Sequence, residues 1–311
     1  MGAFLVVIAK TIQNVEESFG HASVAAKEFA GKKVLSICLK SVMIVGWMLE
    51  YMELLGMMNL WTKVPEPGEK MKQYEAVIEA LKQNGGYATL GQLYQDALKF
   101  PDTEWKTKTP FASIRRIVQV REEIFKIRPG LWALESEREK VMEIFSEEKS
   151  KPKAREYTHS FYQGLVTEIG NLKGYETFIP AQDKNRPYAQ KKLKDVATLS
   201  KFYSFTYPEV LRQAVTIDVT WFNERHFAAS VFEVEHSTDI HRSLLKFVEL
   251  QDFRADFYIV ADSHRKAEFK DKISLAAFSP IKPLVKFLNY DDIANLHTKM
   301  SEAFLAEKTL F

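Results

Sequence analysis

Residues 217–235 read IDVTWFNERHFAASVFEVE, and the rest of the chain can be interpreted outward from this stretch. Two runs rich in β-branched and aromatic residues, 217–222 and 227–235, lie on either side of the polar break NERH at 223–226. Runs of this kind joined by a short polar segment predict two β-strands connected by a turn. The stretch is therefore expected to form a β-hairpin.

Three carboxylates lie within this hairpin, at Asp218, Glu233 and Glu235. Side chains two residues apart on a strand point to the same face, so Glu233 and Glu235 share one face. An even number of loop residues would place Asp218 on that face, opposite or diagonal to Glu233 at about 5 to 8 Å. An odd number would turn Asp218 to the other face.

Carboxylates gathered on one face of a buried sheet require compensation. Two like charges about 5 Å apart repel by roughly 3 kcal/mol at an effective dielectric of about 20. Either the acids take up protons or a cation binds beside them. Mg²⁺ is held by one or two carboxylates together with water and phosphate oxygens. Such a site suits the hydrolysis of a phosphodiester.

The hairpin resembles the core of the PD-(D/E)xK nuclease superfamily, in which an acid on one strand is followed on the next by an acidic-x-Lys triplet. Asp218 matches the first acid and Glu233 the second, while Glu235 stands at the usual position of the lysine. The resemblance implies that Asp218 and Glu233 hold Mg²⁺, with Mn²⁺ as an alternative. It leaves open whether Glu235 adds a ligand or accepts a proton from water. Lys246 or Arg242, on the next predicted helix, would replace the lysine as a phosphate clamp.

The order of elements around the hairpin extends the resemblance to residues 159–311. The pattern predicts a helix at 159–172, a strand at 175–180, the hairpin, a helix at 237–250, a strand at 256–261, a helix at 265–273 and a strand at 285–290. The resemblance implies an α/β fold, a restriction-endonuclease-like core with a mixed central sheet. In some such nucleases an acid on the first helix reaches the metal, which makes Glu168 a candidate catalytic residue. The alternative is an ordinary surface glutamate.

Residues 71–135 show a second pattern, three helices followed by two short strands. The expected elements are a helix from Met71 to the pair Gly85 and Gly86, a helix capped by Thr89, a helix after Pro110, and strands at 124–127 and 131–134. The segments GGYATLGQLYQDAL, TPFASIRRIVQ and FKIRPGLWAL resemble the HARE-HTH type of winged helix-turn-helix. The resemblance implies a DNA-binding domain that precedes the nuclease core.

Two basic stretches favour a polyanionic partner. Seven basic residues face three acidic ones between Glu104 and Arg128, and six face one at 184–201. Basic patches bind phosphates with release of counterions. The alternatives are a solvated surface and, for the winged helix, a module that contacts protein. The residues expected to contact double-stranded DNA are Arg115, Arg116, Arg121, Lys126, Arg128, Lys191, Lys192 and Lys194.

The composition is that of a soluble globular protein. With 311 residues, 46% of them hydrophobic and 27% charged, the chain is long enough for two domains with cores of their own. The formal net charge is +2, so any affinity for nucleic acid must come from local patches. The single cysteine, Cys38, excludes an intramolecular disulfide and a cysteine-based zinc site, and it suits the cytoplasm.

Residues 1–66 form an apolar segment that is expected to be helical and has no assigned function. Its apolar runs fall short of the roughly 20 residues that span a bilayer, and it lacks the features of a signal peptide, so no membrane contact is expected. It either packs as two or three helices on itself or on a partner, or extends a protein whose core starts near Met71. Residues 136–158 are expected to be a solvated linker whose helix ends at Pro152.

These features together predict a Mg²⁺-dependent DNA endonuclease of restriction type, with the winged helix positioning the nuclease domain on duplex DNA. Two-fold symmetric cutting would require a homodimer. A second hypothesis is a nuclease-like domain without catalysis, in which Glu235 marks the loss of chemistry and the protein binds DNA as a regulator. A third is a structural protein built around residues 1–61.

Overall fold

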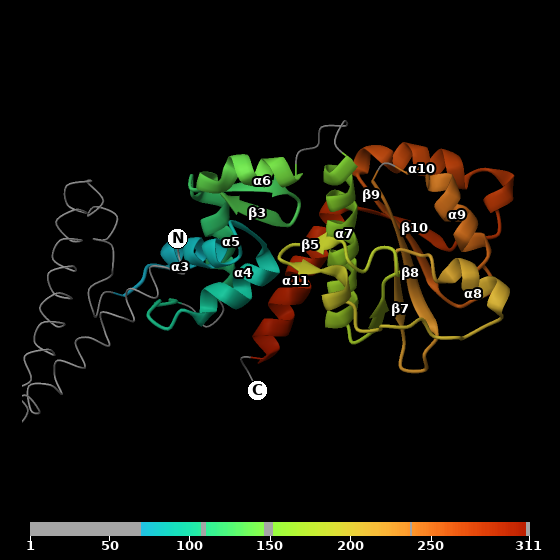
Figure 1. Ribbon diagram of the computed structural model, residues 1–311, viewed down its shortest axis with the longest axis horizontal. Coiled ribbons are helices and arrows are strands. Elements are labelled where there is room, and N and C mark those ends of the chain that lie inside the picture. Colours follow the sequence, from blue (N-terminus) through green and yellow to red (C-terminus); the bar gives the residue numbers. More distant parts are fainter. Residues whose placement is uncertain (1–69, 107–109, 146–151, 237, 309–311) are drawn as a thin grey trace, which may run out of the picture. The chain divides into compact units, whose positions relative to one another are not determined.

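The computed structural model describes residues 70–106, 110–145, 152–236 and 238–308 (Figure 1). The chain divides into two units at Glu69 and Lys70, and all of these residues belong to the second unit. The predictions for residues 1–66 lie outside the described residues. Within the described ranges, no helix is both long enough and apolar enough to cross a bilayer.

The first part of this unit contains three helices and a small antiparallel sheet. The helices are α3 (Gln73–Gln83), α4 (Leu90–Asp96) and α5 (Phe111–Val120), and the strands are β1 (Tyr87–Thr89), β2 (Ile124–Arg128) and β3 (Leu131–Leu134), in the order β1-β3-β2. Thr89 caps α4, because its hydroxyl accepts a hydrogen bond from the Gln92 amide at 3.2 Å. Gly85 and Gly86 follow α3 with positive φ angles. The three helices and the hairpin occur where they were predicted, and β1 adds a strand to them.

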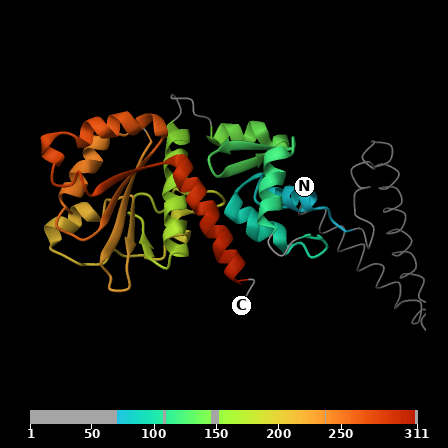
Figure 2. The same ribbon diagram turned by 180° about the vertical axis from the view of Figure 1, so that it is seen from behind.

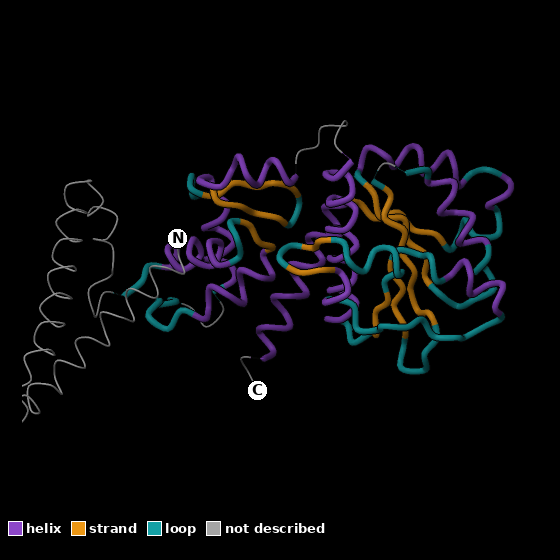
Figure 3. Tube along the Cα trace, viewed as in Figure 1, coloured by secondary structure: helices purple, strands orange, loops and turns teal. Residues whose placement is uncertain are grey.

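A five-stranded mixed sheet forms the centre of the second part (Figure 3). Its strands are β4 (Glu176–Phe178), β7 (Val219–Phe222), β8 (Ala228–Glu235), β9 (Asp256–Ala261) and β10 (Val285–Asn289), in the order β10-β9-β8-β7-β4. β8 pairs with β7, and β7 with β4, in antiparallel fashion, whereas β8, β9 and β10 are parallel. The predicted α/β fold with a mixed sheet is confirmed.

Helices cover both faces of this sheet (Figure 2). One face carries α7 (Pro152–Leu172) and α11 (Tyr290–Lys308), and the other carries α8 (Pro208–Ala214), α9 (Ile240–Val248) and α10 (Lys266–Ile273). Alternation along β8 divides its side chains between the two layers. Phe232 and Val234 pack with α7 and α11, and Val231 packs with α9 and α10. Glu233 and Glu235 therefore belong to the face that α9 covers.

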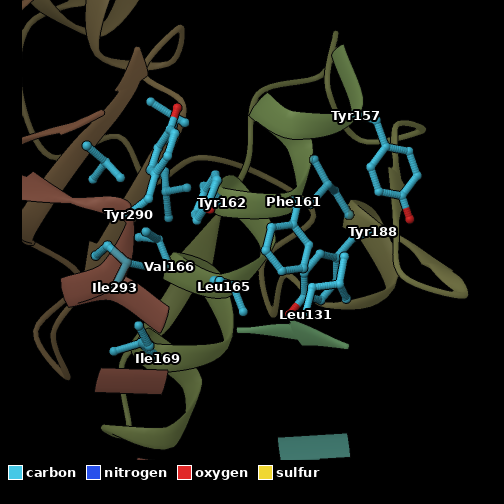
Figure 4. Packing of buried hydrophobic residues seen from close by; sticks show 14 of the residues in the cluster. Leu131, Tyr157, Phe161, Tyr162, Leu165, Val166, Ile169, Tyr188, Tyr290 and Ile293 are labelled. Atoms are coloured by element: carbon cyan, nitrogen blue, oxygen red, sulfur yellow. The ribbon is translucent and has the colours of Figure 1, made fainter. Parts of the chain in front are cut away.

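The two parts share one hydrophobic cluster (Figure 4). Leu131 of β3 is fully buried in it together with Leu165 of α7. The rings of Tyr162 and Tyr290 stack at a centroid distance of 3.6 Å, which joins α7 to the start of α11. Gly130, at the tip of the β2–β3 hairpin, comes so close to α11 that a Cβ atom there would lie 3.0 Å from that of Ala294.

The segment expected to be a solvated linker differs from the prediction. Helix α6 (Arg138–Phe145) buries Val141 and Phe145 in the shared cluster, and α7 begins at Pro152. Val141 and Phe145 are four residues apart and thus form an apolar stripe on one side of a helix. Proline is accepted in the first turn of a helix because the amide hydrogen is not needed there. The helix α11 was not predicted either.

Candidate active site

The register of the β7–β8 hairpin brings the three carboxylates of the hairpin together. Val219 on β7 pairs with Phe232 on β8. Asp218 comes immediately before Val219, and Glu233 comes immediately after Phe232. One oxygen of Asp218, Oδ2, accepts a hydrogen bond from the Val234 amide at 2.7 Å. Asp218 is 9% exposed, and Glu233 and Glu235 are each 3% exposed. The loop at 223–227 is odd in length, but a register shift between Trp221 and Phe222 returns Asp218 to a place opposite Glu233, and all three acids are buried at one end of the hairpin.

Helix α9 supplies polar partners for the two glutamates. Lys246 Nζ donates to both carboxylate oxygens of Glu233, at 2.7 and 3.0 Å, and to the Thr216 carbonyl at 3.0 Å. Ser243 Oγ lies 2.9 Å from Glu233 Oε2 and within hydrogen-bond distance of Glu235 Oε1. Ser243 and Lys246 are three residues apart and so share one face of the helix. Both carboxylate oxygens of Glu233 thus contact an ammonium group from α9.

Glu235 is held by a second cation and a hydroxyl. Its Oε2 accepts from Thr238 Oγ1 and lies 3.8 Å from Arg265 Nη1. The same guanidinium donates to the Glu235 carbonyl at 2.8 Å and to the Thr238 carbonyl at 2.7 Å. Arg265 is 8% exposed, so its charge acts in a poorly hydrated setting, where it offsets that of Glu235.

A polar group from α7 and the following loop surrounds Asp218. His159 Nε2 lies 3.0 Å from Asp218 Oδ2, and the amide of Gln163 donates to the Asp218 carbonyl at 2.7 Å and to Asp183 Oδ2 at 3.1 Å. Arg186 pairs with Asp183 at 3.1 Å and lies 3.4 Å from His159 Nδ1. These contacts were not predicted, because tertiary packing alone joins the segments. Polar residues four apart, at 159 and 163 on an apolar helix, were the available signal.

The buried acids differ in proton affinity. Burial raises the pKa of Glu233 to about 8, and the charge of Asp218 adds to the rise, while Lys246 and Ser243 oppose it. Burial would also raise the pKa of Asp218, but His159, the Val234 amide and Lys246 outweigh it and hold that pKa below its ordinary value. The pKa of His159 is raised, since Asp218 outweighs the effect of burial. Asp218 therefore carries the negative charge, and Glu233 needs more positive charge nearby to ionise fully.

The donor set fits a hard divalent cation. Among the described residues no three His, Cys, Asp or Glu side chains are gathered as an all-protein metal cage would require. Mg²⁺ does not need such a cage, because one or two carboxylates with water and phosphate oxygens suffice. Asp218 and Glu233 offer two carboxylates, and a cation bound there would lower the pKa of Glu233, which burial raises.

Glu168 is placed elsewhere. Its Oε2 accepts hydrogen bonds from His297 Nε2 of α11 at 2.7 Å and from Tyr188 Oη at 2.8 Å. Tyr188 belongs to the short strand β5 (Pro187–Tyr188), which pairs with β6 (Lys191–Lys192). In the part of the chain that is described, no hydrogen bond or ion pair joins Glu168 to the other three acids. Its contacts connect α7 to α11 and to the β5–β6 hairpin.

The residues expected to contact DNA fall into three groups. Arg116, Lys126, Lys191, Lys192 and Lys194 are exposed. Arg121 lies over the ring of Tyr74 at 3.7 Å, and Arg115 pairs with Glu302 of α11 and donates to Tyr94 at 3.1 Å. Arg128 is only 6% exposed and donates to Thr158 at 2.5 Å and to the Phe145 carbonyl at 3.3 Å. Contrary to the prediction, Arg128 is thus directed into the protein, where it joins β2 to α6 and α7.

Comparison with known proteins gives one family. The family described as the C-terminal domain of the type II restriction enzyme NmeDI matches residues 138–309, more than half of the chain. The type II restriction enzyme NmeDI of Neisseria meningitidis serogroup C is 26% identical over 124 residues, which cover 36% of this chain and 35% of that protein. The match thus spans about a third of the relative's length. No solved structure matches the chain.

Proposed function

The chain belongs to the family of the type II restriction enzyme NmeDI C-terminal domain, and we propose that it is a metal-dependent DNA endonuclease whose reaction takes place at Asp218, Glu233 and Lys246. The observation that carries the proposal is the contact between Lys246 and the buried Glu233, at 2.7 Å. Two acids and a lysine are the side chains that the PD-(D/E)xK resemblance requires. Here the lysine comes from α9 and not from β8.

Each residue has a distinct role in this proposal. Asp218 and Glu233 would hold Mg²⁺, or Mn²⁺ in its place, and the bound ion would acidify a water molecule and offset phosphate charge. The Lys246 ammonium lies on Glu233 and can stabilise negative charge that develops on the phosphate. Glu235, which lies 3.8 Å from Arg265 and does not contact Lys246, would be the carboxylate that accepts a proton from water.

The first part of the unit would place the nuclease on double-stranded DNA. Its order of helix, strand, two helices and hairpin is that of a winged helix-turn-helix, in which α5 would be the recognition helix. Beside α5 lies a groove of about 560 Å³ lined by Lys72, Tyr74, Lys106, Arg116 and Arg121. The hairpin that would be the wing packs on α11 and α7 through Gly130 and Leu131. DNA contact is therefore assigned to α5 and its groove, and not to the wing.

A cleavage assay tests the proposal. Purified wild-type protein and the Asp218→Ala variant would be incubated with plasmid and with methylated and unmethylated genomic DNA, with Mg²⁺ or with EDTA. The proposal predicts cutting by the wild type in Mg²⁺ alone. Cutting that persists in the Asp218→Ala variant would contradict the assignment of the site.

One observation favours a second function, a DNA-binding regulator without catalysis, namely Glu235 at the usual position of the lysine. Thermal unfolding in Mg²⁺ or Mn²⁺ separates the two. A ligand at about 100 times its Kd stabilises the folded state by about 2.7 kcal/mol, so an intact cation site predicts that the ion raises the melting temperature of the wild type above its value in EDTA, but not that of Asp218→Ala. No rise in the wild type, together with DNA binding but no cleavage, would favour the regulator.

A further inference from the structure

A hollow of about 540 Å³ lies beside Lys246. It is lined by Gln182, Gln213, Thr216, Arg242, Lys246 and Glu249, with Leu245. Lys246 links the two places, because its ammonium contacts Glu233 and also lines the hollow. A group bound in the hollow would therefore lie next to the proposed reaction centre.

The side chains that line this hollow have free hydrogen-bonding capacity. Arg242 precedes Lys246 by four residues on α9, so the two cations share one face of the helix. Arg242, Gln182 and Gln213 are exposed. Within the described residues, the guanidinium of Arg242 and the amides of Gln182 and Gln213 have no hydrogen bond or ion pair. These groups are available to a ligand without loss of an internal contact.

The chemistry of this lining fits a phosphodiester with its nucleotide. A guanidinium forms two parallel hydrogen bonds with a phosphate, and an ammonium adds a point charge beside it. Carboxamides donate and accept hydrogen bonds, as a base edge or a sugar requires. Lys246 is paired with Glu233, but Arg242 has no ion pair among the described residues, so its charge is available to an anion in the hollow.

Two other hollows share lining residues with this one or with each other, and one of them borders the β5–β6 hairpin. Gln182 also lines a second hollow of about 610 Å³, with Asn185, Arg186 and Pro187. Asn185 and Pro187 line a third, of about 500 Å³, which Lys191, Lys192 and Lys194 complete. The shared residues make the three hollows neighbours, and this series from Arg242 to the lysines of the hairpin is called the path below. Gln190 of that hairpin donates to the Tyr87 carbonyl at 2.9 Å, so the path ends at the first part of the unit.

We propose that the DNA strand that is cut lies along this path, with Arg242 gripping the phosphate at the reaction centre and Gln182 contacting the adjoining nucleotide. The inference rests on the proposed nuclease function and adds to it the course of the strand. Arg242 is a phosphate-binding residue in this arrangement, and Lys246 remains the residue that contacts the acids.

Matched arginine variants test the proposal in single-turnover cleavage. Arg254 is exposed and lies in the turn between α9 and β9, so Arg254→Ala removes the same charge away from the path. We expect Arg242→Ala to raise the protein concentration that gives half-maximal cleavage by about tenfold, as loss of a charged hydrogen-bonding group does. Arg242→Lys should recover part of the loss, and Arg254→Ala should stay within about twofold of the wild type. Equal behaviour of Arg242→Ala and Arg254→Ala would overturn the proposal.

A binding measurement separates this proposal from the proposed function. Fluorescence anisotropy of a labelled 5′-phosphorylated DNA oligonucleotide in EDTA requires no cleavage. We expect Arg242→Ala and Gln182→Ala each to weaken binding at least about fivefold relative to Arg254→Ala. If the wild type never cuts DNA but the variants bind with these relative affinities, the proposed nuclease function is refuted and the proposed course of the strand is supported. A wild type that cuts DNA while both variants bind as tightly as Arg254→Ala would refute the path alone.

Discussion

Glu233 combines burial, a nearby negative charge and a lysine partner, and these give it an unusual pH response. Its pKa in the folded protein is about 8, against an ordinary value of 4.5. At a pH between these two pKa values, the Glu233 carboxyl has lost its proton in the unfolded chain but keeps it in the folded chain. Folding stability therefore falls as pH rises through this window, by up to about 1.4 kcal/mol per pH unit, and levels off above it.

The variant Glu233→Gln removes this dependence. In EDTA, we expect the free energy of unfolding of the wild type to drop between pH 5 and pH 8 relative to that of Glu233→Gln, as measured by urea denaturation at each pH. Glu249→Gln, at the exposed end of the neighbouring hollow, is the matched control and should follow the wild type. Parallel curves for the wild type and Glu233→Gln would refute the raised pKa.

At the scale of single residues, the sequence predicted the features of the site that depend only on the local geometry of a strand. Strand alternation fixes the common face of Glu233 and Glu235, so their pairing follows from the sequence alone. The partners His159 and Ser243 could not be predicted, because their contacts depend on how α7 and α9 pack on the sheet. The contacts of Glu168 could not be predicted for the same reason. From Tyr157 onward, helix α7 is buried on nearly every side, so its apolar pattern did not reveal which neighbour each polar side chain meets.

Glu168 forms a contact between elements, and its effect should appear in stability. Although burial would raise the pKa of Glu168, His297 and Tyr188 outweigh it and hold that pKa below its ordinary value of 4.5. A lowered carboxyl pKa contributes stability that is present above the unfolded value and lost as pH falls through the folded value. We expect Glu168→Gln to lower the free energy of unfolding by about 1 kcal/mol at pH 7 and by less in acid.

The cleavage rate distinguishes this role of Glu168 from a catalytic one. Under the contacts observed, Glu168→Gln should cut DNA within about threefold of the wild-type rate at a temperature well below unfolding. A cleavage rate about 100-fold or more below that of the wild type, with an unchanged free energy of unfolding, would show that Glu168 is a catalytic residue.

Alanine variants at two glycines test whether the β2–β3 hairpin packs closely on α11. Gly130 and Gly85 both have positive φ, at 80° and 72°, but a Cβ atom meets Ala294 only at Gly130 and has nothing within 4 Å at Gly85. Both alanine variants should therefore lose about 1 kcal/mol through backbone strain. Gly130→Ala should lose at least about 1 kcal/mol more, because the hairpin must shift from α11. Equal losses in chemical denaturation would show that the close approach is absent.

At the scale of elements, composition misled at residues 136–158. The segment is rich in charge, yet Val141 and Phe145 suffice to anchor α6 in the core. The prediction followed the charged residues that surround Val141 and Phe145 and gave too little weight to the helical spacing of these two apolar residues. The strand β9 was easier to predict, since Phe257 to Ala261 is a continuous apolar run of the kind found in parallel, doubly covered sheets.

In the whole unit from Lys70 onward, the two parts share Leu131, Leu165 and Tyr290 in one core cluster. We expect them to unfold as one cooperative unit. Leu131→Ala should lower stability by about 2 to 5 kcal/mol, and in native-state hydrogen exchange it should raise the exchange rates of β3 and β8 amides together. Faster exchange confined to β1, β2 and β3 would show that the two parts are independent.

The rate of DNA cleavage by Lys246→Ala tests the central claim most directly, namely that α9 supplies the cation that β8 lacks. Lys266→Ala, an exposed lysine of α10, serves as the matched control. In single-turnover reactions with Mg²⁺, and with melting temperature checked for each protein, we expect Lys246→Ala to be slower by about 100-fold or more. Lys266→Ala should remain within about twofold of the wild type. Cleavage by Lys246→Ala at the wild-type rate would contradict the account.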